Sequence, residues 1–395
     1  MNVPKLRFKE FNDEWQNYKV EDILKISNGI NKEKEFFGSG TPIINYMDVN
    51  KNELISHNIV KGLVIANSKE LETFNVKKGD ILFTRTSETS DEIGLSSSVI
   101  ENIDKCIFSG FILKGTQTKQ FIHPYFGGYY FRNPKMRKEI IKHSSITTRA
   151  LTSGSLLSQM SISIPTIIEQ EKIGKTLSLL DKKIELQTKK IEDLKLFKKG
   201  LLIKEFNNKK CSNKLKECFD FGKAGGTPKS TNKDYYNGYI PFLSISDMTT
   251  QGKYIYYTDK SITEAGLNNS TAWLVPKNSI IISMYASYGL VSINKIDLTT
   301  SQAMFNMVIN KNYVVEYIYY YLYYLYISNF YNSIVSTGTQ SNLNAGQIKL
   351  LDIYIPCYNE QKRIYEQFSK IDFKINLEQK KINELLYLKK GLMQN

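Results

Sequence analysis

Apolar residues recur at helical spacing along two long segments, residues 165–202 and 356–393. Each segment follows a proline, contains no internal proline, and is rich in Lys, Glu, Leu and Ile, which favour helix. The apolar positions alternate at steps of four and three, or multiples of them, which predicts a narrow seam. The seam residues are Ile173, Leu177, Leu180, Ile184, Ile191 and Leu194 in the first segment, and Ile364, Phe368, Ile371, Ile375, Ile382 and Leu385 in the second.

The two segments are copies of each other. They align over 38 residues at a constant offset of 191, without a gap, and 17 positions are identical. Polar residues interrupt the seam at the same two places, Gln187/Glu378 and Lys198/Lys389. A narrow seam with shared interruptions favours a coiled coil whose two strands come from one chain. At 1.5 Å per residue each helix would be roughly 57 Å long. The alternative is that each helix packs only on its own domain.

The segments that precede the two helices predict globular domains. They match each other weakly at an offset of 199, as at Pro42/Pro241 and in the strand-like run after Val76/Val275. Short apolar runs such as Ile280–Ser283 and Met304–Ile309 indicate strands, and helices are expected at about 124–142 and 314–332. We expect an α+β chain, with a first mixed domain at 1–164, a helix at 165–206, a second domain at 207–355 and a helix at 356–395.

The tyrosine-rich stretch at residues 317–327 is the longest apolar-looking run. It is too short to span a membrane, which takes about 20 apolar residues. We expect a buried helix there, although the wider cluster at 313–331 would also offer surfaces for base stacking. The N-terminus lacks the continuous apolar core of a signal peptide. These features predict a cytoplasmic protein without a membrane partner.

Composition narrows the function classes. The four cysteines contain no CxxC pair and the three histidines no HxxxH spacing, which excludes a disulfide scaffold and a zinc ribbon and disfavours a histidine metal site. The net charge of +14 makes a polyanion the first partner to consider. However, +8 of this charge lies on residues 165–210 and 356–395. The basic excess therefore does not identify a reading surface.

Over essentially its whole length, the chain resembles the specificity (S) subunit of type I restriction–modification systems. The resemblance is carried by Pro-x-x-x-Glu-Gln helix starts at Pro165 and Pro356 and by Lys-Lys-Gly-Leu helix ends at 198–201 and 389–392. The strand entries at Pro42 and Pro241, the strand at 79–82 and the motif at 336–343 also fit, whereas residues 143–151 depart from that last motif.

The resemblance implies a division of labour. Two target-recognition domains would each read one half of a split target in double-stranded DNA. The two helices would pair as an antiparallel coiled coil, which spaces the domains and docks methylation (M) subunits, two of them by expectation. Restriction (R) subunits would join the same complex. S-adenosylmethionine, ATP and Mg²⁺ are expected on those partners, and no cofactor in this chain.

A catalytic role for the chain itself has little support in the sequence. There is no Asn/Asp-Pro-Pro-aromatic tetrapeptide for amino-group methylation, no glycine-rich cofactor loop after a strand, and no well-placed acidic nuclease cluster. We therefore expect a non-catalytic subunit of a DNA adenine methyltransferase and restriction complex. Two alternatives stay open: a coiled-coil adaptor without sequence-specific DNA binding, and a stand-alone DNA-modifying enzyme.

Candidate DNA contacts lie in polar loops. Arg85 follows a predicted strand, and arginine is the commonest bidentate reader of guanine, while Thr86 and Ser87 could contact phosphate. The equivalent loop of the second half lacks a cation, so Tyr285 and Ser287 would contribute hydroxyls. The alternative for each is an ordinary solvated loop.

Further candidates flank the long helices and a glycine-rich loop. Polar residues that precede the helices are Thr147, Thr148 and Arg149 in the first half, and Thr339, Gln340 and Asn342 in the second. Gln and Asn suit adenine, but such runs are more often plain turns. Lys223, Lys229 and Lys233 surround Gly225 and Gly226, where a flexible basic loop would suit phosphate or simply be solvated.

Overall fold

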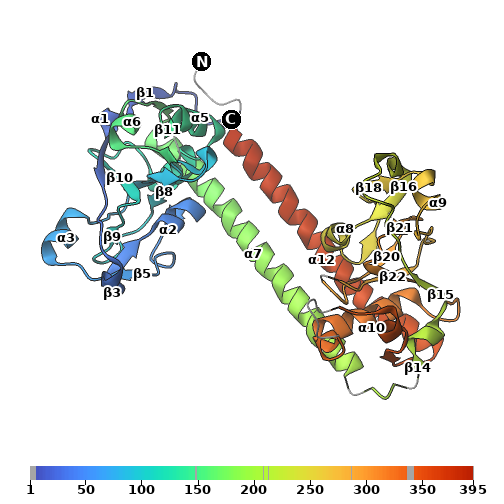
Figure 1. The fold of residues 1–395 in the computed structure, drawn as a ribbon. Helices are drawn as coiled ribbons and strands as arrows, with labels where there is room; N and C mark the ends of the chain where they lie inside the picture. Colours follow the sequence, from blue (N-terminus) through green and yellow to red (C-terminus); the bar gives the residue numbers. More distant parts are fainter. Residues whose placement is uncertain are drawn as a thin grey trace. The chain divides into compact units, whose positions relative to one another are not determined.

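The computed structural model describes residues 6–146, 149–207, 209–211, 213–285, 287–335 and 342–394. The chain divides into two compact units, drawn in Figure 1. The first comprises Met1–Thr188 with Lys380–Asn395, and the second comprises Lys189–Gln379. Each unit therefore combines one globule with a part of both long helices. The four-part division at residues 164, 206 and 355 remains our interpretation of the chain.

Within the described part of the first globule, the main sheet has five strands in the order β2-β10-β6-β8-β4, all antiparallel except the pair β4 and β8. A three-stranded sheet, β5-β3-β9, packs beside it. The strands are β1 (Gln16–Lys19), β2 (Leu24–Asn28), β3 (Phe37–Ile44), β4 (Leu54–Ile55), β5 (Gly62–Val64), β6 (Ile81–Thr84), β7 (Thr86–Ser87), β8 (Ser96–Val99), β9 (Ile107–Phe108), β10 (Ile112–Gln117), β11 (Ser145–Ile146), β12 (Ala150–Leu151) and β13 (Ser161–Ile164). The helices are α1 (Val20–Ile23), α2 (Tyr46–Lys51), α3 (Ser68–Thr73), α4 (Pro124–Tyr130), α5 (Pro134–Lys142) and α6 (Gly154–Ser158).

The second globule repeats this topology in its described residues, with the sheets β15-β22-β19-β20-β17 and β18-β16-β21. Even the irregularity in β3 between Phe37 and Thr41 recurs in β16 between Tyr236 and Ile240. The elements are β14 (Asn213–Lys214), β15 (Phe219–Ala224), β16 (Tyr236–Leu243), α8 (Ile245–Gln251), β17 (Tyr254–Ile255), β18 (Lys260–Ile262), α9 (Glu264–Asn268), β19 (Ile280–Ser283), β20 (Val291–Asn294), β21 (Thr299–Thr300), β22 (Met304–Ile309), α10 (Val315–Ile327), α11 (Ala345–Lys349) and β23 (Asp352–Ile353). The predicted α+β class with two pseudo-repeated domains is confirmed.

Two predicted helices differ from the structure. The stretch 124–142 is two helices, α4 and α5, because Pro134 begins a new one and the Asn133 side chain accepts a hydrogen bond from the Met136 amide at 2.9 Å. The stretch 314–332 is α-helical only in α10, since Asn329 adopts a left-handed conformation with φ of 58° and turns the chain into a short 3-10 helix at Phe330–Ser333. The tyrosines at 317, 319, 320, 321 and 331 are buried, so the interpretation of this cluster as core is confirmed.

The long helices are α7 (Ile167–Phe206) and α12 (Tyr358–Gln394), and within each unit their segments run antiparallel. In the first unit the Lys389 ammonium lies 2.6 Å from the Asp181 carboxylate. In the second, Lys190 lies 2.8 Å from Glu378 and Lys198 lies 2.5 Å from Asp372. In the second unit the residue number rises from 190 to 198 along α7 while that of the partner falls from 378 to 372 along α12, as expected for antiparallel helices.

All twelve predicted seam residues lie in the described part of the helices, and each is buried or half-buried. Leu177, Ile191 and Ile382 are at most 6% exposed, whereas Leu186 and Leu196, which lie off the seam, are more than half exposed. The ends of the helices also pack on the globules, because Phe206 and Phe368 belong to the core of the second unit. The helix pair and the helix–domain packing that the sequence offered as alternatives therefore coexist.

The repeated Pro-x-x-x-Glu-Gln starts tie each long helix to its globule. The Gln170 side chain accepts a hydrogen bond from the His123 amide at 2.8 Å, at the N-terminus of α4, and donates to the Phe121 and Pro165 carbonyls. Gln361 accepts from the Val314 amide at 3.0 Å, at the N-terminus of α10. Both glutamines are buried. These repeated residues therefore hold each long helix against its globule and are not exposed for contact with a ligand.

Candidate nucleic-acid interface

One end of the five-stranded sheet gathers loops in each globule. In the first globule Leu113 of β10 lies between Asn28 of β2 and Phe83 of β6. The residues after β2 and β6 and those before β10 therefore emerge at the same end. In an antiparallel pair, the end of one strand lies beside the start of the other. In the second globule, the residues after β15 and β19 and those before β22 therefore also lie at one end of the sheet.

Arg85 stands at this end with its backbone fixed on both sides. Its amide donates to the Phe111 carbonyl at 2.9 Å, and its carbonyl accepts from the Thr152 amide at 3.0 Å. The chain then continues as β7, which pairs with β12 so that Ser87 lies opposite Ala150. Arg85 thus leads directly into a short strand rather than into a free loop. The same pairing brings Ser87 opposite Ala150, which directly follows Arg149 in the chain.

The Arg85 guanidinium is half-buried and makes no hydrogen bond or ion pair within the described part of the chain. Four other arginines have partners in the fold: Arg7 with Glu169, Arg363 with Glu360, Arg132 with the carbonyls of residues 49, 50, 52 and 96, and Arg137 with those of Asp91 and Ile93. Burial lowers the pKa of Arg137 to about 10. Because Arg137 binds the segment that follows β7, it supports the backbone from which Arg85 projects.

The polar residues beside Arg85 are placed differently from one another. Thr86 is half-buried, whereas Ser87 is buried and its hydroxyl accepts a hydrogen bond from the Thr89 amide at 3.2 Å. Ser87 is therefore directed into the protein. Arg149 is exposed. Thr147 and Thr148 lie outside the described residues.

Exposed apolar side chains lie on the segments that neighbour the two arginines, and the sequence reasoning missed them. Phe111 is 62% exposed, and Ile146 and Leu151, on β11 and β12, are also exposed. Large exposed apolar groups beside cations mark interaction surfaces, and apolar groups can contact thymine methyls in the major groove. A usable signal was the position of Phe111 directly after Gly110, at a turn where a large apolar residue has no core to enter.

The second globule builds the same scaffold from other side chains. Met284 occupies the place of Arg85: its amide donates to the Ala303 carbonyl at 2.7 Å and its carbonyl accepts from the Leu343 amide at 2.9 Å. Tyr285 and Ser287 are exposed, and Asn342 is half-buried next to Leu343. Thr339 and Gln340 lie outside the described residues. The backbone arrangement is shared, while the charge is not.

The glycine-rich loop of the second globule is packed rather than open. The Gly225 amide donates to the Met304 carbonyl at 3.0 Å and the Gly226 amide to the Thr300 carbonyl at 2.9 Å. A Cβ atom on Gly226 would lie 2.2 Å from the Ala272 nitrogen, so the glycines allow a close backbone approach. Lys223 and Lys229 are nevertheless exposed near the same sheet end.

The counterpart of Lys233 in the first globule, Lys34, was missed by the sequence reasoning. Lys34 and Lys233, related by the offset of 199, each begin a short 3-10 helix after β2 and β15, and both are exposed. Exposed lysines suit phosphate contacts, which position a protein on DNA without reading its sequence. The recurrence at a known offset was the signal that would have found Lys34.

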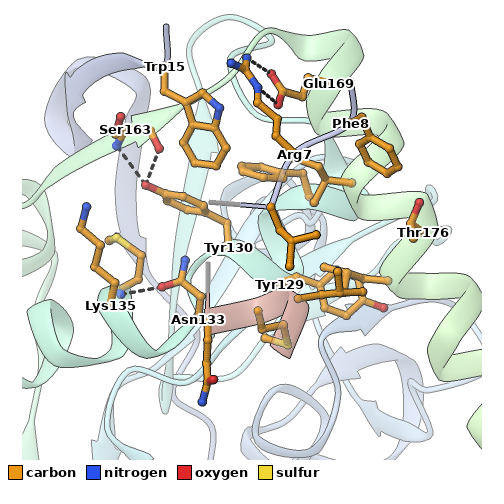
Figure 2. Close-up of a pocket in the computed structure, with 18 residues that line it drawn as sticks. Arg7, Phe8, Trp15, Tyr129, Tyr130, Asn133, Lys135, Ser163, Glu169 and Thr176 are labelled. Atoms are coloured by element: carbon orange, nitrogen blue, oxygen red, sulfur yellow. Dashed lines mark hydrogen bonds and ion pairs between the residues drawn. The ribbon is translucent and has the colours of Figure 1, made fainter. Parts of the chain in front are cut away.

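A cavity of about 340 Å³ lies elsewhere in the first unit (Figure 2). Its wall is mostly apolar, with Trp15, Phe126, Tyr130 and the last residues of α12 among its lining. Arg7 closes one side through two 2.7 Å hydrogen bonds to the buried Glu169 carboxylate, which hold the N-terminal segment on α7. No candidate DNA contact lines this cavity. It therefore belongs to the anchoring of the N-terminal segment.

Within the residues that the structure describes, no group of three or more His, Cys, Asp and Glu side chains is placed to hold a metal ion. In those same ranges, no helix combines the length and the apolar character needed to cross a bilayer.

Comparison with known proteins places the chain in a family. The type I restriction modification DNA specificity domain matches residues 12–196 and again residues 208–387. The putative type I restriction enzyme MjaX specificity subunit of Methanocaldococcus jannaschii is 25% identical over 434 aligned positions, which cover 99% of this chain and 95% of that protein. The MjaIX specificity subunit of the same organism is 31% identical over 176 residues, which are 44% of this chain and only 40% of that relative.

Solved structures share the fold. The S subunit of a type I restriction–modification system from M. genitalium aligns over 98% of this chain and 97% of its own, with a TM-score of 0.57 and 16% identity. A chain from a study of type I R-M complex assembly and conformational transition aligns over 97% of both chains, with a TM-score of 0.62 and 15% identity. With two matches to the specificity domain and this shared fold, the chain belongs to the family of type I restriction–modification specificity subunits.

Proposed function

We propose that each globule reads one half of a split DNA target through the loops at the end of its five-stranded sheet. The observation that carries the proposal is the identical fixing of Arg85 and Met284 by two backbone hydrogen bonds, with different side chains around them. A constant backbone with variable side chains is what two different half-sites require. Phosphate contacts would come from Lys223, Lys229, Lys34 and Lys233.

In the first globule, Arg85 and Arg149 are the proposed readers, with Phe111 as an apolar neighbour. Arginine pairs in a bidentate manner with the O6 and N7 atoms of guanine, and each such pair discriminates by about 1–3 kcal/mol. In the second globule, Tyr285, Ser287 and Asn342 would read through hydroxyl and amide groups. The buried Ser87 is not proposed as a direct contact.

The long helices are proposed to set the spacer between the two half-sites and to form the docking surface for partner subunits. Exposed apolar residues recur on both helices at the repeat offset of 191, as the pairs Leu186/Leu377, Leu196/Tyr387 and Phe197/Leu388. Such residues off the seam mark an interaction surface, and their repetition supports two copies of one partner. These partners would be the methylation subunits, with restriction subunits joining the complex.

Catalysis is assigned to those partners. We place adenine methylation with S-adenosylmethionine, and ATP- and Mg²⁺-dependent cleavage, on the M and R subunits, and sequence reading on this chain. An assembly that modifies cellular DNA would work in the cytoplasm. The adaptor alternative predicts no sequence preference that depends on this chain.

The test asks whether a substitution in one globule changes only one half of the methylated DNA motif. The chain is co-purified with its candidate methylation partner, and methylated adenines are mapped across genomic DNA incubated with the complex. R85A should relax one half of the motif by about tenfold or more and leave the other half intact, because about 1–3 kcal/mol of discrimination is lost at one position. N342A should relax the other half.

R363A is the matched control, since Arg363 is an exposed arginine on α12 that pairs with Glu360. It should leave both halves of the motif unchanged. Equal effects of R85A on both halves, or an unchanged motif with R85A and N342A alike, would contradict the assignment of one half-site to each globule.

A further inference from the structure

A cluster of tyrosine, aspartate and lysine joins the first globule to both long helices. The Tyr129 hydroxyl of α4 donates to Asp181 Oδ2 of α7 at 2.7 Å. Lys389 Nζ of α12 lies 2.6 Å from Asp181 Oδ1 and 5.4 Å from the centre of the Tyr129 ring. Three elements thus meet at one carboxylate.

The second unit contains the same cluster. The Tyr320 hydroxyl of α10 donates to Asp372 Oδ2 of α12 at 2.6 Å, and Lys198 Nζ of α7 lies 2.5 Å from Asp372 Oδ1. All three residues are the repeat copies of the first cluster at the offset of 191. In each cluster the lysine comes from the long helix that does not carry the aspartate.

The globules contribute different charges to these clusters. Glu53, just before β4, places Oε1 3.1 Å from Lys389. At the equivalent place before β17, Lys253 Nζ donates to the Tyr320 hydroxyl at 2.7 Å and lies 3.6 Å from Asp372. The constant triad therefore accommodates an acid from one globule and a base from the other.

The apolar seam alone does not define one register. If one helix slides by seven residues along the other, aliphatic residues again face aliphatic residues. Lys198 and Lys389 interrupt the seam, and their side chains are only 12% and 15% exposed. In a shifted register, these ammonium groups and the two aspartates would lose their partners while still largely shielded from water. Unpaired charges in such surroundings are strongly unfavourable.

We propose that Tyr129–Asp181–Lys389 and Tyr320–Asp372–Lys198 are positioning clusters that fix the antiparallel register of α7 and α12 within their own units. Each also holds α4 or α10 of its globule at that level of the helix pair. The link from register to DNA spacing rests on the proposed function. The register itself does not, and it is measurable without DNA.

The experiment traps the register by disulfide formation in the full chain. Cys211 and Cys357 are replaced by serine, and either I184C/L385C or I184C/L392C is introduced. The first pair lies one helical turn from the Asp181–Lys389 contact and reports the observed register. The second reports a slide by seven residues. Disulfide yields are measured by mass spectrometry after mild oxidation.

In the unmodified background, the first pair should form a disulfide in about tenfold or greater excess over the second, since polar seam pairs specify register. K389M should raise the yield of the second pair several-fold. K389R, which keeps the cation, should behave as the parent. E53K should also behave as the parent, because Lys253 occupies the same place in the second unit.

An unchanged ratio in K389M would show that the seam alone fixes the register and would overturn the proposal. A shifted ratio in K389R or E53K would also overturn it, which keeps the test decisive even if K389M does not fold. A separate outcome is that the cross-links follow the prediction while R85A and N342A do not each change one half of the methylated motif. That outcome would refute the proposed DNA-reading function and leave this inference standing.

Discussion

At the scale of single residues, Lys114 and Asp80 form a buried ion pair in the first globule, with 3.7 Å between Lys114 Nζ and Asp80 Oδ2. Burial raises the pKa of Asp80 and lowers the pKa of Lys114, so each charge is costly where it lies. The equivalent positions of the second globule hold the buried neutral residues Ser279 and Asn306. The shared fold therefore accommodates two uncharged side chains at the positions of this ion pair.

Removing one partner of this pair should be worse than removing both. We expect D80N to lower the free energy of unfolding by about 3–5 kcal/mol, because Lys114 is left as an uncompensated buried charge. D80N/K114M should recover a large part of that loss. Urea unfolding of the full chain measures both, and a double variant no more stable than D80N would contradict this reading.

Lys253 gives a pH-dependent prediction. Burial, partly opposed by Asp372, lowers the pKa of Lys253 to about 8. Between pH 8 and the ordinary lysine value of about 10.4, the unfolded chain binds more protons than the folded chain, so stability gains with rising pH. Relative to K253M, the wild-type free energy of unfolding should increase by about 3 kcal/mol across that range.

The comparison is made by urea unfolding at closely spaced pH values from 7.5 to 10.5. The other titrating groups are common to both chains, so they cancel in the difference. A stability difference that does not vary with pH would show that Lys253 keeps its ordinary pKa in the folded protein.

At the scale of elements, the two long helices dock on their globules in different ways. A Cβ atom on Gly174 of α7 would lie 2.5 Å from the Phe126 nitrogen and 2.6 Å from the Tyr125 carbonyl carbon. The second copy carries Tyr365 at this position. Gly174 therefore permits a close contact between α7 and α4, whereas Gly200, farther along α7, has no neighbouring atom within 4 Å of such a Cβ.

These two glycines form a matched pair for mutation. G174A should destabilise the chain by about 1–3 kcal/mol, because the added methyl group meets backbone that must move. G200A should stabilise it by about 0.5–1 kcal/mol, because alanine favours an exposed helix interior. Thermal unfolding of both variants measures this, and a G174A protein as stable as G200A would rule out the close contact.

Elements with a strong local pattern were predictable from the sequence. The seam follows from its spacing, and β19 and β22 were predicted with their observed limits because their apolar runs are bounded by turn residues. The break at Pro134 was also readable, since proline starts a helix and disfavours helix at the residue before it.

Long-range pairing was not predictable. The two-residue strands β7 and β12 bring Arg85 beside the segment that carries Arg149, and such short strands have no signal of their own. The structural equivalence of Glu53 and Lys253 was not predictable either, because insertions change the residue offset between the two globules. Gly225 and Gly226 suggested a flexible phosphate loop, but glycine serves close packing equally well, and only the neighbouring backbone decides.

At the scale of the whole molecule, the proposed function requires that two different half-sites are read and that the helix pair sets the spacer between them. A heptad adds about 10 Å of helix, and one base pair of DNA rises 3.4 Å. Seven residues inserted into α7 alone should shift one helix relative to the other, separate the paired Asp and Lys residues, and abolish binding. The same insertion at matched positions in both helices should preserve the pairs.

The most direct measurement maps methylated adenines for the complex of a methylation partner with either the wild-type or the doubly lengthened chain. We predict a motif of two fixed halves with a fixed spacer, lengthened by roughly 3 base pairs in the doubly lengthened protein with both halves unchanged. An unchanged spacer would contradict the role of the helices. A motif without two halves, or methylation by this chain alone, would contradict the account as a whole.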